Sequence, residues 1–95
     1  MYTIYVVFKC APGKREEYIK TLKDEGLIDA IRNEDGCIRY DYYFSEKEED
    51  EILLIEARES KKHQEIHLEQ PHMKRAFEIK PKYVLSTKLG EFELK

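Results

Sequence analysis

The chain has 95 residues and a net charge of −3, from 17 lysines and arginines against 20 aspartates and glutamates. A chain of this length forms one small domain and buries only about 60 to 65% of its unfolded surface, so association with a second subunit would add stability. The acidic balance excludes nonspecific binding to nucleic acid or to an anionic membrane. We therefore expect one domain over residues 1–95.

The sequence also indicates where the protein works. Its longest apolar run, residues 4–8, is far shorter than the roughly 20 residues that cross a bilayer. The first residues lack the pattern of a secretory signal, which predicts a cytoplasmic protein. Cys10 and Cys37 are too few for a disulfide scaffold and lack metal-binding spacing, so we expect two reduced thiols.

The first half of the chain predicts a strand and a helix. Residues 2–10 are rich in β-branched and aromatic side chains, which is typical of a strand, and Pro12-Gly13 ends it. Residues 14–33 have helical periodicity, but the apolar stripe changes phase at Gly26. We expect a kinked or two-piece helix that ends at Asp35-Gly36, where glycine can adopt the left-handed conformation of a helix stop.

The second half predicts an alternating strand, a central strand, two helical segments and a last strand. Residues 37–45 alternate as a strand, residues 46–50 form an acidic loop, and the apolar run within residues 51–59 indicates a central strand. Ser60 is a suitable N-cap for a helix to residue 68, and Pro71 can begin another helical segment to residue 77. Pro81 ends that segment, and residues 82–92 supply the last strand.

The resulting order, β-α-β-β-α-β, is typical of an α+β ferredoxin-like sandwich, in which helices cover one face of an antiparallel sheet. The other face needs cover, because apolar side chains are expected on it: Tyr5, Val7, Tyr43, Ile52 and Leu54. A homodimer that packs two such faces together is the simplest solution. The same topology separates Cys10 from Cys37, so these thiols should not bond within one chain.

Four segments then carry a resemblance to a known family. They are residues 11–14, 34–40, 55–56 and 67–74. In this order and spacing the chain resembles, over nearly its whole length, the antibiotic biosynthesis monooxygenase domain family, small dimeric α/β-barrel proteins that include quinol monooxygenases. The resemblance implies a homodimer and cofactor-free oxygenation of a phenolic or quinol-type small molecule. In such chemistry the protein deprotonates the substrate, and the anion reduces the co-substrate O2 without a flavin or a metal.

Three side chains are candidates for the proton chemistry. His67 and His72 lie where the family motif carries histidines, and a histidine with a pKa near 6.5 can accept a proton at neutral pH. We expect His67 to act as base or proton shuttle, although both histidines could instead cap helices or bind the backbone. Glu56 lies in an apolar strand and needs a partner, which could be Arg39, Arg58 or a histidine. It is either part of a structural pair or an acid or base that tunes His67.

The expected substrate pocket combines aromatic and charged side chains, although tyrosines in strands more often serve packing. Its candidate residues are Tyr5, Tyr40, Tyr42, Arg58, His72 and Phe77. Arg58 stands where the family commonly carries a tryptophan, and the chain has none. An arginine there favours an anionic substrate or a surface pair with Glu56 or Glu59. The haem-degrading branch of the family uses an asparagine, a tryptophan and a histidine at three positions. Val6, His67 and Phe77 stand at these positions here, which disfavours haem degradation.

A metal site and two other functions are alternatives. His63 and His67 have the spacing that places two imidazoles on one helix face, but no HExxH motif is present and His63 follows two lysines, so we expect no metal. Besides the monooxygenase, the chain could be an isomerase or other proton-transfer enzyme for a small metabolite, phosphorylated or not. It could also be a ligand-binding dimer without catalysis, because the fold alone does not separate these functions.

Overall fold

The structure, a computed structural model, describes residues 1–93 as a sheet covered by helices. The elements are β1 (Tyr2–Cys10), α1 (Arg15–Asp24), α2 (Leu27–Arg32), β2 (Cys37–Phe44), β3 (Glu51–Arg58), α3 (Lys61–Leu68), α4 (Pro71–Ile79), the 3-10 turn η1 (Lys80–Lys82) and β4 (Val84–Glu91). None of the helices in this part of the chain is long and apolar enough to cross a bilayer. The predicted element order is confirmed, except that Pro81 lies within the 3-10 turn.

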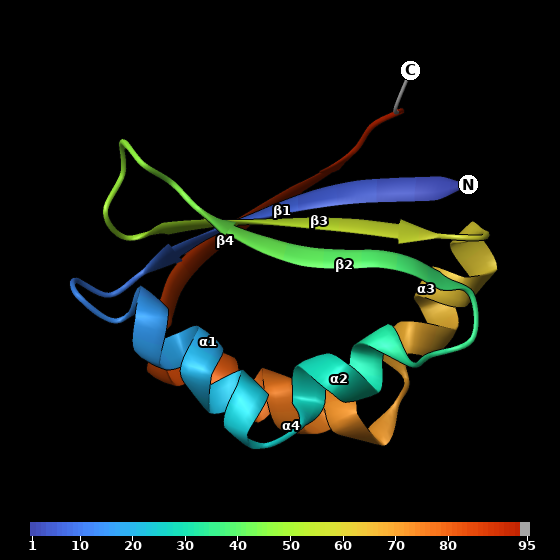
Figure 1. The fold of residues 1–95 in the computed structure, drawn as a ribbon, viewed down its shortest axis with the longest axis horizontal. Coiled ribbons are helices and arrows are strands. Elements are labelled where there is room, and N and C mark those ends of the chain that lie inside the picture. Colours follow the sequence, from blue (N-terminus) through green and yellow to red (C-terminus); the bar gives the residue numbers. More distant parts are fainter. Residues whose placement is uncertain (94–95) are drawn as a thin grey trace.

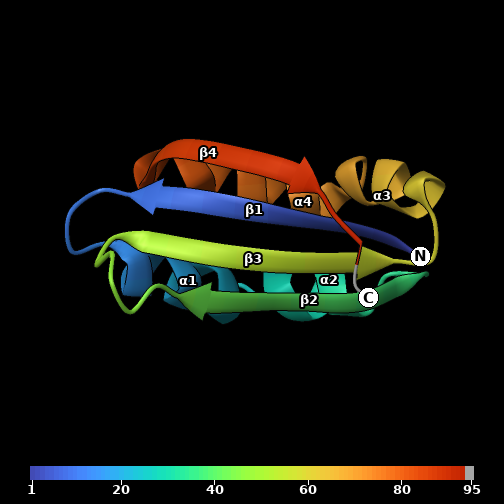
Figure 2. The ribbon, with the colours of Figure 1, turned by 90° about the horizontal axis from the view of Figure 1, so that it is seen from above.

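The sheet has the strand order β2-β3-β1-β4, and every neighbouring pair is antiparallel. All the helices lie on one side of it (Figure 1). Seen from above, α1 and α2 lie beneath β3 and β2, whereas α4 lies beneath β1 and β4 (Figure 2). These two layers are the expected ferredoxin-like sandwich.

The break between α1 and α2 explains the change of phase in the sequence. Gly26 has a φ of 74°, a left-handed conformation that glycine adopts without a steric penalty. Leu22 before the break and Ile28 after it are both buried. The turn at Gly26 therefore redirects the chain so that the apolar residues of both pieces face the sheet, and the predicted two-piece helix is confirmed.

The register of the sheet corrects the expected assignment of two side chains. Ile52 pairs with Phe8 and Leu54 pairs with Val6, so both lie on the helix-facing side, where they are 0% and 2% exposed. The prediction that they lie on the outer face is wrong. The run of residues 52–55 is apolar at both parities, so its pattern does not reveal which residues point toward the helices.

The outer face of the sheet is nevertheless apolar at its centre. Tyr5 and Tyr43 lie there as expected, 37% and 43% exposed, and Val7 lies beside them. Leu53 and Ile55, the register partners of Val7 and Tyr5, take the places expected for Ile52 and Leu54. Within residues 1–93 no helix covers this face (Figure 1).

The two cysteines lie at opposite ends of the sheet. Cys10 is the last residue of β1, whereas Cys37 pairs with Arg58, which also pairs with Tyr2 at the beginning of β1. Both thiols are free, as the topology predicts. The cytoplasmic location inferred from the sequence stays a prediction.

Candidate active site

A cavity of about 210 Å³ lies between the sheet and the helices. Most of its wall is apolar and comes from β1, from α1 and α2, and from α4. Leu68, Phe77 and Leu89 line it and are also about half or more exposed, so the mouth lies where α3, α4 and the edge strand β4 meet. A largely apolar hollow with a few polar groups is characteristic of a site for a small organic molecule.

Several polar groups of the wall gather at one end of the cavity. Glu56 on β3 lies between Ile4 and Tyr40 in the register of the sheet, and all three line the cavity. His67 enters the wall from α3, with its ring centroid 6.1 Å from that of Tyr40. The hydroxyl groups of Tyr40 and Tyr42 lie 3.2 Å apart. A base, a carboxyl group and two phenols therefore face the same space.

Glu34, in the turn before β2, joins the two histidines. Because a carboxylate only accepts hydrogen bonds, Nδ1 of His67 donates to its Oε1 and Oε2 at 2.7 and 2.9 Å, and Nε2 of His72 donates to Oε2 at 2.5 Å. The sequence motif at residues 34–40 contains Glu34 but assigns no role to its side chain. The contact with His67 spans 33 positions, which a local pattern cannot reveal.

Arg58 completes this buried cluster. Its side chain is only 1% exposed, and its Nη1 donates to Glu56 at 2.7 Å while its Nη2 donates to Glu34 at 3.3 Å. The expected pair with Glu56 is confirmed, but it is buried rather than at the surface, and Glu59 contacts His63 instead. Arg58 does not line the cavity, so it is not placed to bind an anionic substrate there.

Burial and neighbouring charges set the protonation of the cluster. Burial lowers the pKa of His67, and the hydrogen bond that it donates to Glu34 opposes this effect only in part. Burial raises the pKa of Glu56 in spite of the attraction of Arg58. Because His67 is neutral at pH 7 and its Nδ1–H is donated to Glu34, its Nε2 carries a free lone pair. That atom lies 3.9 Å from Oε1 of Glu56, too far for a hydrogen bond between them.

The structure brings most of the expected site residues into one place. Tyr40, Tyr42 and Phe77 line the cavity together with His67 and Glu56. His72 stands behind this wall and touches the site through Glu34.

Tyr5 does not belong to this pocket. It lies on the outer face of the sheet, because alternate residues of β1 point to opposite sides and its neighbours Ile4 and Val6 face the helices. The strand is apolar at both parities, so the sequence alone does not show which tyrosine faces the helices.

Two polar residues of the wall were not expected from the sequence. Gln64 comes from α3, and within residues 1–93 its buried Oε1 has no hydrogen-bond partner. Lys80, at the end of α4, places its Nζ 5.3 Å from the ring centroid of Phe8. Both are polar residues in helical segments whose sequence pattern is that of a solvated face, and only the tertiary packing turns them inward.

The sequence also matches the profile of one known protein family. The profile of the family described as antibiotic biosynthesis monooxygenase matches residues 1–79. The chain belongs to this family. The family resemblance inferred from the four sequence segments is thereby confirmed, and the buried cluster described above is the polar site of an antibiotic biosynthesis monooxygenase family domain.

Individual proteins resemble this family domain in sequence or in fold. The uncharacterized protein sll1783 of Synechocystis is 30% identical over 73 residues, which cover 77% of this chain and 48% of that protein. The chain thus spans about half the length of this relative. The crystal structure of SO0527 from Shewanella oneidensis superposes with a TM-score of 0.84 at 25% identity, covering 96% of this chain and 87% of that one. A crystal structure described as antibiotic biosynthesis monooxygenase gives a TM-score of 0.85 at 16% identity. The superposition covers 100% of this chain and 99% of that one.

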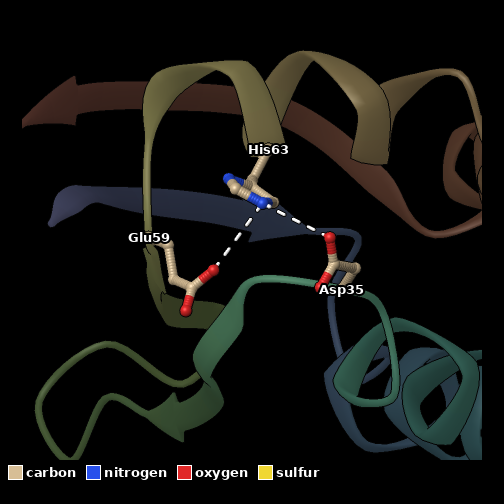
Figure 3. A group of neighbouring side chains, drawn as sticks. All are labelled: Asp35, Glu59 and His63. Atoms are coloured by element: carbon tan, nitrogen blue, oxygen red, sulfur yellow. Dashed lines mark ion pairs between the residues drawn. The ribbon is translucent and has the colours of Figure 1, made fainter.

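The histidines of this family domain do not converge on one metal position. His63 turns toward Asp35 and Glu59 (Figure 3), with its Nε2 3.5 and 3.7 Å from their carboxylate oxygens. His67 turns toward Glu34 instead. In residues 1–93, Asp35, Glu59 and His63 are the one group whose ligand atoms lie within 4.8 Å of one another and could hold a cation. Asp35 is 98% exposed, so this group is a surface cluster outside the cavity.

Replacing Glu34 by glutamine tests the cluster. Because the carboxylate raises the pKa of His67, we expect Glu34→Gln to lower that pKa further. The unfolding free energy should fall by roughly 3 kcal/mol, since Arg58 loses a buried partner. The pKa is measured by NMR titration of the imidazole, and the stability by urea unfolding.

Glu59→Gln is the matched control, because it removes a surface partner of His63 and should cost less than about 1 kcal/mol. An unchanged pKa of His67 in Glu34→Gln would show that the hydrogen bond between the two side chains does not control the imidazole.

Proposed function

We propose that the protein is a cofactor-independent monooxygenase that acts on a quinol or phenolic small molecule, with O2 as the second substrate. The observation that carries the proposal is the position of His67, which is 3% exposed, lines an apolar cavity and is held by Glu34. Membership of the monooxygenase family supports the same reaction class. Neither a flavin nor a metal is required by this proposal.

In the proposed first step, a phenolic hydroxyl of the substrate lies against Nε2 of His67 and transfers its proton to that atom. Burial lowers the pKa of His67, so the imidazole is unprotonated at pH 7 and its Nε2 is available to accept the proton. Glu34 fixes the tautomer by accepting the Nδ1–H, and it stabilises the imidazolium that forms. His72 donates a hydrogen bond to Oε2 of Glu34 and helps to hold this carboxylate in place.

In the proposed oxygenation, the substrate anion gives one electron to O2, and the resulting radical and superoxide combine at a ring carbon. The peroxide then loses water together with the hydrogen of that carbon, which leaves a quinone. One oxygen atom enters the product and the other leaves as water, and all the electrons come from the substrate. His67 returns the proton that it took to the leaving oxygen, which restores the neutral imidazole. Glu56 lies beside this imidazole and tunes the transfer, while Tyr40, Tyr42 and Phe77 hold the ring.

A second candidate is a proton-transfer enzyme, such as an isomerase, that needs no O2. It is supported by the pairing of an imidazole of lowered pKa with a carboxyl group of raised pKa in one cavity, because such a pair can move a proton between two carbons. The sequence-based reason for a phosphorylated substrate was Arg58, and its burial between two carboxylates removes that reason.

Oxygen consumption tests the proposal directly. Wild-type protein in metal-free buffer is mixed with a panel of quinols and phenols, and O2 uptake and product are recorded under air and under argon. We expect uptake with at least one quinol, and His67→Gln should lower kcat/KM by roughly 10² to 10⁴, the usual contribution of a general base.

His63→Gln is the matched control, because this histidine is on the same helix but at the surface, and it should leave kcat/KM nearly unchanged. Product formed at the same rate under argon would favour the proton-transfer enzyme, and no turnover of any quinol would contradict oxygenation of this substrate class.

We also propose that two copies of the chain form a homodimer through the outer face of the sheet. The proposal is supported by the apolar side chains of that face, which no helix of residues 1–93 covers (Figure 1). Tyr5 and Tyr43 are exposed, and Val7, Leu53 and Ile55 are half-buried. Burying this patch would supply the stability that a small domain lacks. The barrel that two packed sheets would form leaves each cavity within its own subunit.

The position of Leu53 at the centre of that face allows a test. Leu53→Lys places a charge between the two sheets, so we expect sedimentation velocity to show a monomer where the wild type shows a dimer. Ile66→Lys is the matched control, because Ile66 is exposed on α3, on the other side of the sheet, and should leave the dimer intact. A monomeric wild-type protein, or a dimeric Leu53→Lys variant, would contradict this interface.

A further inference from the structure

The cavity holds a second charged group, Lys80, at some distance from His67. Lys80 is the first residue of η1, and its side chain is half-buried in the wall of the cavity, with Nζ 5.3 Å from the ring centroid of Phe8. Tyr18 packs edge-on against the same ring. The ammonium group therefore lies among aromatic side chains rather than in bulk water.

The register of the sheet sets the distance between the His67 end and the Lys80 end of the cavity. Glu56, beside His67, is paired with Ile4, whereas Phe8, beneath Lys80, lies four residues further along β1. At about 3.3 Å per residue, four residues correspond to roughly 13 Å along the strand. The cavity thus has a base at one end and a cation at the other, with apolar wall between them.

The ammonium group of Lys80 has no close counter-ion in the part of the chain that the structure describes. Among residues 1–93, no carboxylate lies within 4.0 Å of its Nζ, and the acid that shares the cavity, Glu56, is bound to Arg58. Burial lowers the pKa of Lys80, as expected for an ammonium group without a counter-ion. An anion placed there would pair with a charge that is already partly removed from water, so little further desolvation of the ammonium would oppose the attraction.

We propose that Lys80 binds the anionic group of an elongated aromatic substrate whose phenolic hydroxyl reaches His67. The substrate class is then an aromatic hydroxy acid, bound lengthwise between the two ends of the cavity. The orientation toward His67 rests on the proposed function, whereas the binding of an anion by Lys80 does not. Lys80 also distinguishes this cavity from a purely apolar one, which would prefer the uncharged phenol.

Two probes that differ by one carboxylate test the proposal. Calorimetry under argon measures the Kd of 6-hydroxy-2-naphthoate and of 2-naphthol, so binding is read without turnover. We expect the wild type to bind the carboxylate roughly 10-fold more tightly or better, as for one charge-assisted hydrogen bond. Lys80→Met, a substitution of similar length, should abolish that preference, and Lys80→Arg should keep most of it.

Lys82→Met is the matched control, because it removes a charge from the same turn at an exposed position, and the preference should survive. Thermal unfolding checks that each variant is folded. Equal affinity of the wild type for both probes, or a preference that survives Lys80→Met, would contradict the proposal. It would show that the Lys80 side chain only packs on Phe8 and binds no anion. Binding that depends on Lys80 without any oxygen uptake would sustain this inference while contradicting the monooxygenase.

Discussion

The carboxylate of Glu34 is the interaction on which the site depends. It accepts hydrogen bonds from His67 and His72 and an ion pair from Arg58, so the turn before β2 is tied to α3, α4 and β3 at once. A buried carboxylate must be paired in this way, because an unpaired one would cost several kcal/mol. One guanidinium serves both Glu34 and Glu56, and the two histidines donate hydrogen bonds to the oxygens of Glu34. The same contacts that hold the helices on the sheet therefore prepare an imidazole to accept a proton.

The shape of the cavity follows from how the helices are divided. The left-handed turn at Gly26 lets α1 and α2 present mainly apolar residues to the sheet along their whole length, so the side of the cavity that they line is mostly apolar. His67 and Glu56 enter from α3 and β3 at the end where Glu34 lies, whereas Lys80 lies at the other end, beside Phe8. A mostly apolar wall suits a reaction in which a substrate anion must meet O2, because few competing polar groups weaken the charge interactions within it.

The fold could be predicted from the sequence because its signals are local. Alternation in the strands, the change of phase at Gly26 and the Ser60 cap, whose side chain accepts from the backbone N–H of His63, each depend on neighbouring residues. Which face of β3 turns inward depends instead on its register with β1, and the run of residues 52–55 is apolar at both parities. The predicted proton-transfer residues His67 and Glu56 do meet at one cavity, whereas Glu34 and Lys80 gain their places only from contacts between distant segments.

The central claim is that His67 and Glu34 act as a base on a phenol held in the cavity. It is tested most directly by NMR titration of the His67 imidazole under argon with bound 2-naphthol and with bound naphthalene, which lacks the hydroxyl. A phenolic hydroxyl that donates to Nε2 stabilises the neutral imidazole, so 2-naphthol should lower the pKa of His67 more than naphthalene does. Naphthalene measures the effect of excluding water alone. An equal pKa of His67 in the two complexes would contradict a base that meets a phenol in this cavity.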